Sequence, residues 1–176
     1  SVVLATYGRG RCIAPTIESI LNQTFSAFEL IVVGDGCEDD TEAVVASFNS
    51  EQISWRNLAQ NSGGQSRPNN EGICCARGAW ICYIGHDDVW SPDHLAALHK
   101  LVKRDEAVDF AVSGCINYGP LGSEIHSVTG IFNANRPRFL HFYPPSSFAH
   151  RRDVVERIGK WRDPRSARSS VARGGG

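Results

Sequence analysis

The sequence predicts an α/β fold, a Rossmann-like three-layer sandwich in which helices cover both faces of a mostly parallel central sheet. Short apolar runs alternate with stretches whose apolar residues recur at the helical period. Several runs are apolar throughout, as expected for strands buried on both faces of a parallel sheet. The 176 residues are 41% hydrophobic and 21% charged, which fits one compact domain with a substantial core.

Four strands are expected in the first half of the chain, because each is a short apolar run that ends at glycine or at polar residues. They cover residues 2–5, 30–33, 53–56 and 80–84.

Four helices are expected to follow these strands. Apolar side chains share one face of the first helix, namely Ile13, Ile17, Ile20 and Leu21. The second is predicted to begin at Asp39, which forms a capping box with Glu42. The third is expected over residues 70–77, and the fourth begins at Ser91, where a capping serine precedes a proline and an acid.

Beyond Asp109 the pattern changes to an α+β arrangement. Residues 110–116 and 125–129 are predicted strands with no long helix between them, and residues 153–158 a short helix that ends at Gly159. Pro144 and Pro145 indicate a turn.

The domain is therefore expected to cover residues 1–163. We assign residues 1–108 to a ligand-binding half and residues 109–163 to a second half that contacts another substrate. Residues 164–176 are predicted to be a truncated or disordered tail, because they are rich in serine, arginine and glycine.

Charge is distributed unevenly along the chain. From Arg136 onwards the chain has ten Lys/Arg and three Asp/Glu, whereas the residues before Arg136 include eight Lys/Arg and sixteen Asp/Glu. This basic C-terminal part would suit phosphates or a peripheral contact with an anionic membrane, and the alternative is a solvated, partly disordered end.

Composition also bears on the cellular compartment. No apolar run is long enough to cross a bilayer and no signal segment precedes the first strand, so we expect a cytoplasmic protein, with the inner face of the membrane as a further location. The six cysteines lack paired spacing and are expected to be reduced and mostly buried, with one of Cys74 and Cys75 accessible. The lack of methionine indicates an excised domain or a missing start.

Polar groups follow three of the predicted strands. They are Thr6-Tyr7, Asp35, and the turn His86-Asp87-Asp88. In open parallel sheets ligands bind at the carboxyl ends of the strands, where the strand order reverses. These three strand ends are therefore the candidate site.

The chemistry of the turn suggests a divalent cation. Asp87 and Asp88 repel each other at the end of an apolar strand unless a positive charge neutralises them, and Mg²⁺ or Mn²⁺ prefers oxygen ligands. The alternative is that either residue only caps a turn. Asp35 either accepts hydrogen bonds from a base or ribose or is an ordinary turn aspartate. His86 and His150 either contact a ligand or have a structural role.

Two common nucleotide-binding motifs are missing. Residues 63–65 are rich in glycine, but their spacing is not that of a P-loop, and no GxGxxG motif is present. Both observations count against an NTPase and against a dinucleotide-dependent dehydrogenase.

Taken in order, the motifs resemble the family 2 glycosyltransferases, which have the GT-A fold of nucleotide-diphospho-sugar transferases. The resemblance extends from Ser1 to Asp163. Its segments are SVVLATYGR at 1–9, TIESILNQT at 16–24, FELIVVGDGCEDDT at 28–41, GQSRPNNEG at 64–72, AWICYIGHDDVWSPDHL at 79–95 and PPSSFAHRRDVVERIGKW at 144–161.

The resemblance implies metal-assisted transfer of a sugar from a nucleoside diphosphate sugar to an acceptor hydroxyl, with inversion. It implies a UDP-sugar as the first choice of donor and GDP- or dTDP-sugars as alternatives. The acceptor would be a glycan, a lipid-linked molecule or a small molecule, and not a nucleic acid. Residues matched to donor binding are Thr6, Tyr7, Asp35, Asn70, His86 and Asp87. Asp87 and Asp88 would hold Mn²⁺ or Mg²⁺.

The sequence departs from the family pattern in several places. Gly85 stands where the family's DXD motif has its first acid, Gly34 replaces a frequent aspartate, and Asn69 replaces a frequent arginine. No acid follows Asp163, although the family has its general base some way after the Gly159-Lys160-Trp161 segment. We therefore expect the base to lie beyond the end of the chain or to be missing.

Two other functions remain open. A non-catalytic module that binds nucleotide sugars would explain the missing base. A nucleotidyltransferase shares the layered design, but it needs a basic glycine-rich loop after the first strand, which residues 8–11 only faintly suggest.

Overall fold

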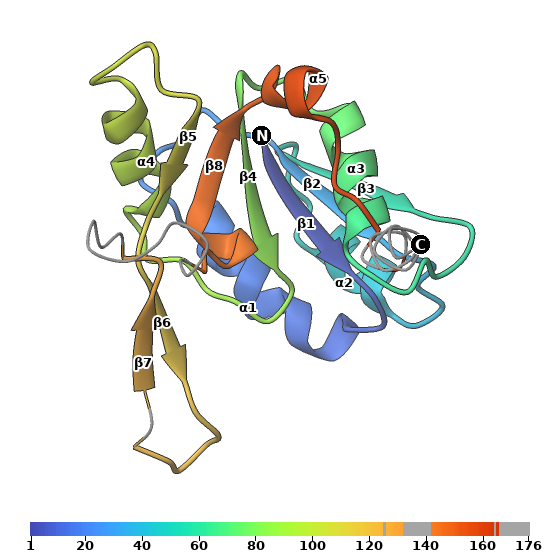
Figure 1. Ribbon diagram of the computed structural model, residues 1–176. Coiled ribbons are helices and arrows are strands. Elements are labelled where there is room, and N and C mark those ends of the chain that lie inside the picture. Colours follow the sequence, from blue (N-terminus) through green and yellow to red (C-terminus); the bar gives the residue numbers. More distant parts are fainter. Residues whose placement is uncertain (125, 132–141, 164, 166–176) are drawn as a thin grey trace, which may run out of the picture.

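Six strands form one mixed sheet in the computed structural model, which describes residues 1–124, 126–131, 142–163 and 165 (Figure 1). The strand order is β3-β2-β1-β4-β8-β5. In chain order the elements are β1 (Val2–Thr6), α1 (Gly10–Leu21), β2 (Leu30–Gly34), α2 (Thr41–Ser47), β3 (Ile53–Asn57), α3 (Ser66–Cys75), β4 (Trp80–Gly85), α4 (His94–Val102), β5 (Phe110–Val112), β6 (Cys115–Tyr118), β7 (His126–Thr129), the 3-10 helix η2 (Pro145–Ser147), β8 (Phe148–Arg151) and α5 (Val154–Ile158).

The sheet is parallel over its first four strands. β1 pairs with β2 on one side and with β4 on the other, and β3 extends the sheet beyond β2. β8 is antiparallel to both β4 and β5. The predicted mostly parallel sheet is thus confirmed, and its order reverses beside β1, between β1 and β4.

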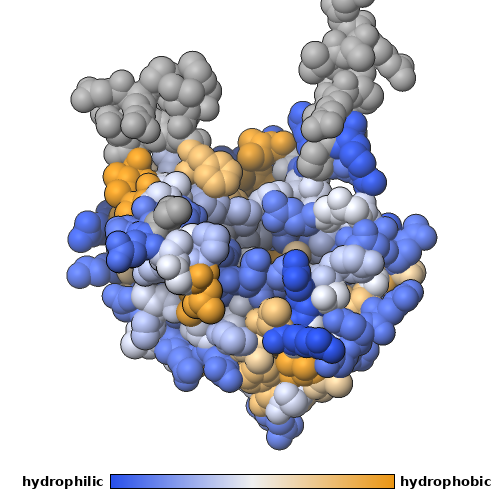
Figure 2. All heavy atoms as spheres, turned by 90° about the horizontal axis from the view of Figure 1, so that it is seen from below, coloured by the Kyte–Doolittle hydropathy of each residue, from blue (hydrophilic) through white to orange (hydrophobic). Residues whose placement is uncertain are grey.

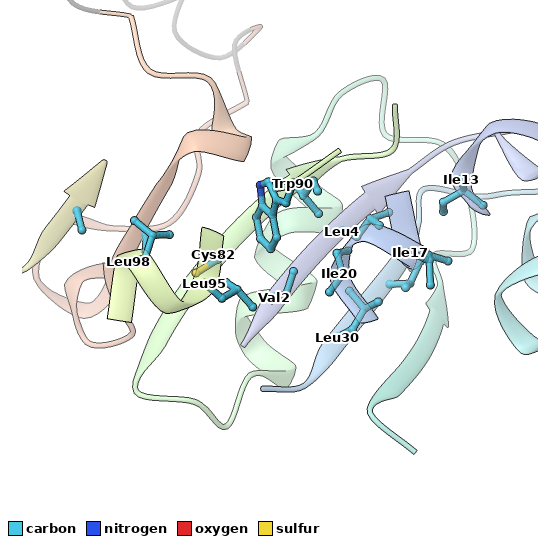
Figure 3. Close-up of a cluster of buried hydrophobic side chains, with 14 of the residues drawn as sticks. Val2, Leu4, Ile13, Ile17, Ile20, Leu30, Cys82, Trp90, Leu95 and Leu98 are labelled. Atoms are coloured by element: carbon cyan, nitrogen blue, oxygen red, sulfur yellow. The ribbon is translucent and has the colours of Figure 1, made fainter. Parts of the chain in front are cut away.

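Helices cover both faces of this sheet, which gives the predicted three layers. On one face α1, α2 and α4 pack against side chains that include Val2, Leu4 and Leu30 (Figure 3). On the other face α3 packs against Val3 and Val33. Successive residues of β1 alternate between the two cores, so Val2, Val3 and Leu4 are all buried, as the continuous apolar run predicted.

Three predicted helix starts differ from the structure. The N-cap of α2 is Asp40 and not Asp39, whose carboxylate accepts hydrogen bonds from the Gly10 N–H and the Thr41 hydroxyl at 3.1 and 2.5 Å. α3 begins at Ser66, four residues before the predicted start at residue 70. Pro68 lies in its first turn, where the missing N–H of a proline costs no hydrogen bond within the helix.

α4 begins at His94, later than the predicted start at Ser91. Here the side chain of Gln23, two residues after α1, accepts a hydrogen bond from the Leu95 N–H at 2.9 Å. A cap from another element thus replaces the local capping serine, and no local sequence pattern reports such a partner.

The second half of the chain differs most from the prediction. The single strand expected over residues 110–116 is two strands, β5 and β6, which belong to different sheets. β6 pairs with β7 in a two-stranded hairpin that projects from the body of the molecule (Figure 1). β8 was not predicted, and the turn expected at Pro144 and Pro145 includes the start of η2.

The prediction of mostly buried cysteines is wrong. Only Cys82 is buried, whereas Cys12 and Cys74 are exposed and the other three are partly exposed. All six are free thiols, and an accessible member of the Cys74-Cys75 pair was correctly expected.

The predicted tail over residues 164–176 lies, except for Arg165, outside the described residues. Within the described part of the chain, no helix has the length and apolarity that a membrane crossing requires.

Candidate functional site

The three polar strand ends predicted from the sequence meet at one edge of the sheet. Thr6 lies opposite Gly34, which precedes Asp35, and Ala5 lies opposite Gly85, which precedes the acidic turn. This edge holds the carboxyl ends of β1, β2 and β4, at the point where the strand order reverses. Viewed from this side, the surface is largely hydrophilic, and apolar side chains form separate patches (Figure 2).

Thr6 and Asp35 form the buried floor of the site. They are 3% and 4% exposed, and the Asp35 N–H donates to the Thr6 carbonyl at 2.8 Å. One carboxylate oxygen of Asp35, Oδ2, accepts hydrogen bonds from the backbone and the hydroxyl of Ser62, both at 3.0 Å. The Thr6 hydroxyl and Asp35 Oδ1 have no partner among the described residues. Because buried polar groups are normally paired, these two atoms are available to a ligand.

Tyr7 stands above this floor. Its side chain is 53% exposed and borders a hollow of about 410 Å³ that Gly36 and Glu38 also line. The turn beside the hollow requires a glycine at position 36, since the φ angle there is +76° and a Cβ atom would lie 2.5 Å from the Asn61 nitrogen. An exposed aromatic ring beside a hollow suits stacking against a planar group.

The acidic turn directs two carboxylates to one point. Asp87 and Asp88 are exposed, and an ideal Cβ atom on Gly85 would lie 3.3 Å from Asp87 Oδ1 and 2.8 Å from Asp88 Oδ2. Behind the turn, the Thr16 hydroxyl reaches the carbonyls of His86 and Asp88 at 3.0 and 2.8 Å. Ser146 of η2 donates a short hydrogen bond to Asp88 Oδ2. Side chains from two other elements thus hold the turn and the Asp88 carboxylate in place.

These groups fit a hard divalent cation. Two converging carboxylates supply oxygen ligands, and Mg²⁺ or Mn²⁺ commonly takes one or two carboxylates and completes its shell with substrate phosphates. No group of three or more His, Cys, Asp and Glu side chains in the described part of the chain forms a protein-only metal site. A cation bound by these two carboxylates would need its other ligands from water or from a bound substrate.

Asn70 lies on α3, and its amide is engaged with the backbone of a later segment. It donates to the Trp161 carbonyl and accepts from the Trp161 N–H, both at 2.9 Å. A hollow of about 500 Å³ lies beside it, lined by residues that include Ser62, Arg67 and Arg165. Asn70 thus fixes the segment that follows Gly159, and its predicted contact with a donor stays a prediction.

His150 has a structural role. It is buried, its Nε2 lies 2.7 Å from the Tyr83 hydroxyl, and its Nδ1 lies 2.7 Å from the Arg151 carbonyl. Burial lowers the pKa of His150 and raises that of Tyr83, so both groups are held neutral. The alternative that His150 faces a phosphate or acceptor is therefore wrong. His86, by contrast, is only half-buried beside the carboxylates.

Sequence reasoning missed three supporting hydroxyls, those of Thr16, Ser62 and Ser146. Each contacts a predicted site residue from a different element. Thr16 and Ser146 do fall within the segments that resemble the family, but no local periodicity distinguishes them from the other serines and threonines of the chain.

Asp163 is a poor candidate for a general base. Its carboxylate accepts hydrogen bonds from Arg165 at distances from 2.7 to 3.1 Å. These contacts hold the pKa of Asp163 below its usual value. They stabilise its carboxylate anion, which would have to accept the proton if Asp163 were the base. The expectation that the base lies beyond the end of the chain or is missing stays a prediction.

A larger hollow, of about 640 Å³, lies at the opposite edge of the sheet. It is lined mainly by apolar residues, including Val2, Trp80 and Leu98, at the amino ends of β1 and β4. None of the predicted site residues lines it.

Comparison with known proteins agrees with this geometry. The model of the family described as glycosyl transferase family 2 matches residues 1–159. The glycosyltransferase GlyG of Streptococcus pneumoniae serotype 4 is 31% identical over 119 residues, which cover 67% of this chain and 39% of GlyG.

Two solved structures share the fold. S. aureus TarS 1–349 in complex with UDP-GlcNAc has a TM-score of 0.73 at 20% identity, over 89% of this chain and 46% of that one. The mannosyltransferase PcManGT from Pyrobaculum calidifontis, in complex with GDP-Man and Mn²⁺, has a TM-score of 0.69 at 18% identity, over 90% of this chain and 46% of that one. The chain thus spans about half the length of these proteins or less, and its sheet has the GT-A fold. With its family model matched from the first strand to Gly159, the chain belongs to glycosyl transferase family 2.

Proposed function

We propose that this chain is the donor-binding core, with part of the acceptor side, of an inverting glycosyltransferase that uses a divalent cation. One observation carries the proposal. Two converging carboxylates, on Asp87 and Asp88, lie on the same sheet edge as two buried oxygen atoms that have no partner among the described residues, the Thr6 hydroxyl and Asp35 Oδ1. Such an edge suits a ligand that has a polar nucleoside at one end and a metal-bound diphosphate at the other.

The donor would extend across the ends of three strands. Tyr7 would stack on the base, Thr6 and Asp35 would hydrogen-bond the nucleoside, and His86 would lie beside the diphosphate. Asp87 and Asp88 would hold Mn²⁺ or Mg²⁺, which stabilises the charge on the leaving diphosphate as a Lewis acid when bound. The presence of UDP-GlcNAc and of GDP-Man with Mn²⁺ in the two related structures supports a nucleoside diphosphate sugar as the donor.

The acceptor side is expected in residues 109–163. Inversion requires a general base that takes the proton of the acceptor hydroxyl, and we assign none of the described residues to this role. A glycan, a lipid-linked molecule and a small molecule all remain candidate acceptors. The cytoplasmic location and the membrane contact of the basic C-terminal part likewise stay predictions.

The first test is whether nucleotide binding depends on the metal through Asp87. UDP and GDP should each be tested with and without Mn²⁺, and at least one of them should raise the melting temperature only when the metal is present. Asp87→Ala should abolish this metal-dependent rise, whereas Asp93→Ala, at another exposed aspartate six residues further on, should leave it intact. Unchanged metal dependence in Asp87→Ala would disprove the assignment.

The missing base favours one alternative, a module that binds nucleotide sugars without transferring the sugar. It predicts the same metal-dependent binding, but no transfer to any acceptor even by a longer chain that continues past residue 176. Detection of transferred sugar, for example by release of UDP together with a mass increase of the acceptor, would exclude this alternative.

A further inference from the structure

Gly85 is the residue that most weakens the resemblance to a metal-dependent transferase, because the family's motif has an acid there. The structure shows what occupies the space beside it. A Cβ atom on Gly85 would lie 2.8 Å from Asp88 Oδ2 and 3.4 Å from Asp88 Cγ. Since contacts under 3.0 Å essentially never occur for a real Cβ atom, a side chain at position 85 and the present position of the Asp88 carboxylate exclude each other.

The Asp88 carboxylate is held in this position by Ser146, which belongs to η2, 58 residues further along the chain. The Ser146 hydroxyl accepts a hydrogen bond from the Gly85 N–H at 2.9 Å. Its single proton is therefore free to be donated, and it goes to Asp88 Oδ2. One hydroxyl thus joins the end of β4 to the carboxylate beside it.

Ser146 is itself fixed in place. It is 7% exposed, and its carbonyl accepts a hydrogen bond at 2.7 Å from the buried indole N–H of Trp90, which follows the acidic turn. Backbone and side chain of Ser146 therefore both contact the segment 85–90. On the other side of the turn, Thr16 holds the carbonyls of His86 and Asp88. The Asp88 carboxylate extends from this fixed backbone, and Ser146 orients it.

We propose that Ser146 is a positioning residue for the metal site, and that Asp88, held by Ser146 beside Gly85, supplies the carboxylate that an acid at position 85 would otherwise supply. This rests on the proposed function, because it assumes that Asp87 binds the metal. The cation would then lie between Asp87 and Asp88, whose Oδ1 and Oδ2 atoms approach the same point next to Gly85. Glycine at position 85 makes room for this arrangement.

The test compares Ser146→Ala with Ser147→Ala. Both serines are buried in η2, but the Ser147 hydroxyl donates to the Pro144 carbonyl at 2.8 Å. The readout is the Mn²⁺ concentration that gives half of the metal-dependent thermal stabilisation at a saturating concentration of UDP, or of GDP if that is the nucleotide bound. Ser146→Ala should raise this concentration about tenfold or more, the usual effect of removing a group that orients a metal ligand. Ser147→Ala should leave it within about twofold, and Ser146→Thr, which keeps the hydroxyl, should restore it.

A second variant acts on the same carboxylate while Ser146 stays intact. In Gly85→Ala the added Cβ atom would lie 2.8 Å from the present position of Asp88 Oδ2. The substitution should therefore displace the Asp88 carboxylate and weaken Mn²⁺ binding in the same way. Gly85→Asp should also weaken it, although this change restores the family's acid. If Ser146→Ala and Gly85→Ala both fold and bind Mn²⁺ as the unmodified protein does, or if Gly85→Asp alone tightens binding, the proposal is wrong.

The two proposals fail in different ways. If the unmodified protein shows no metal-dependent nucleotide binding at all, the proposed function fails. If it shows such binding, and Asp87→Ala removes it but the variants at positions 85 and 146 do not change it, only the role of Ser146 and Asp88 fails. Should Ser146→Ala not fold, Gly85→Ala decides the matter by the same measurement.

Discussion

At the scale of single residues, the site contains a buried hydroxyl that the fold itself does not use. Thr6 Oγ1 has no partner among the described residues, and burying an unpaired hydroxyl costs about 1–3 kcal/mol. Thr6→Val keeps the shape and removes this cost, so it should raise the free energy of unfolding of the ligand-free protein by about 1 kcal/mol. The same change should weaken nucleotide binding, because the hydroxyl is then lost to the ligand.

Thr16→Val is the matched control. Thr16 is as deeply buried, at 1% exposed, but its hydroxyl lies within hydrogen-bond distance of two carbonyls of the acidic turn and shares its one proton between them. The substitution should therefore lower the free energy of unfolding by about 1–2 kcal/mol. Urea denaturation of both variants measures the two signs directly. If both valines destabilise the protein, the Thr6 hydroxyl has a partner that the fold needs, and its assignment to the ligand is wrong.

How far sequence reasoning could reach is clear from these residues. Thr6, Asp35 and Asp87 could be located because each follows an apolar run, and a parallel sheet brings such strand ends together. Ser146 could not, since its contact with Asp88 joins positions 58 residues apart and depends on one hydroxyl rotamer. Ser62 is hidden for a similar reason, because its loop carries no periodicity.

At the scale of elements, α3 lies unusually close to the sheet. A Cβ atom on Gly72 would lie 2.3 Å from Val3 Cγ1, so the helix needs a glycine at its contact with β1. Gly72→Ala should lower the free energy of unfolding by about 1–3 kcal/mol, the cost of overpacking a core, although alanine is the better helix former. Combining it with Val3→Ala should cost less than the sum of the two single changes. Gly64→Ala, with open space around it, is the control, and urea midpoints are the measurement.

The elements themselves were predictable where burial on both faces sets the pattern. β1, β2 and β4 were found almost to the residue, because two cores enforce continuous apolar runs. The start of α4 was not, because its cap comes from Gln23, which follows α1. β8 was missed because it is a four-residue strand whose antiparallel pairing with β4 and β5 depends only on tertiary structure.

At the scale of the whole molecule, the chain beyond residue 108 contributes to two structures of different kinds. β5 and β8 extend the central sheet and share its cores through Ala111 and Ala149. The β6–β7 hairpin forms its own two-stranded sheet, and its large side chains Ile116, Tyr118 and Val128 are 56%, 80% and 53% exposed. The proposed acceptor half thus contains both a part that belongs to the donor-binding sheet and a part that stands apart from it.

This difference predicts two levels of protection from amide hydrogen exchange. Amides of β1, β2 and β4 should exchange only when the whole domain unfolds, because their side chains are buried on both faces of the sheet. Amides of β8 should exchange at the same rate, since β8 is paired on both sides. A two-stranded hairpin that buries no core is marginally stable, so the amides of β6 and β7 should exchange at least about a hundredfold faster. Exchange followed by mass spectrometry of peptides measures all of these rates. If β8 exchanges with the hairpin and not with β4, the chain divides near residue 108 into two separately stable parts, and the single cooperative sheet argued from its pairing is wrong.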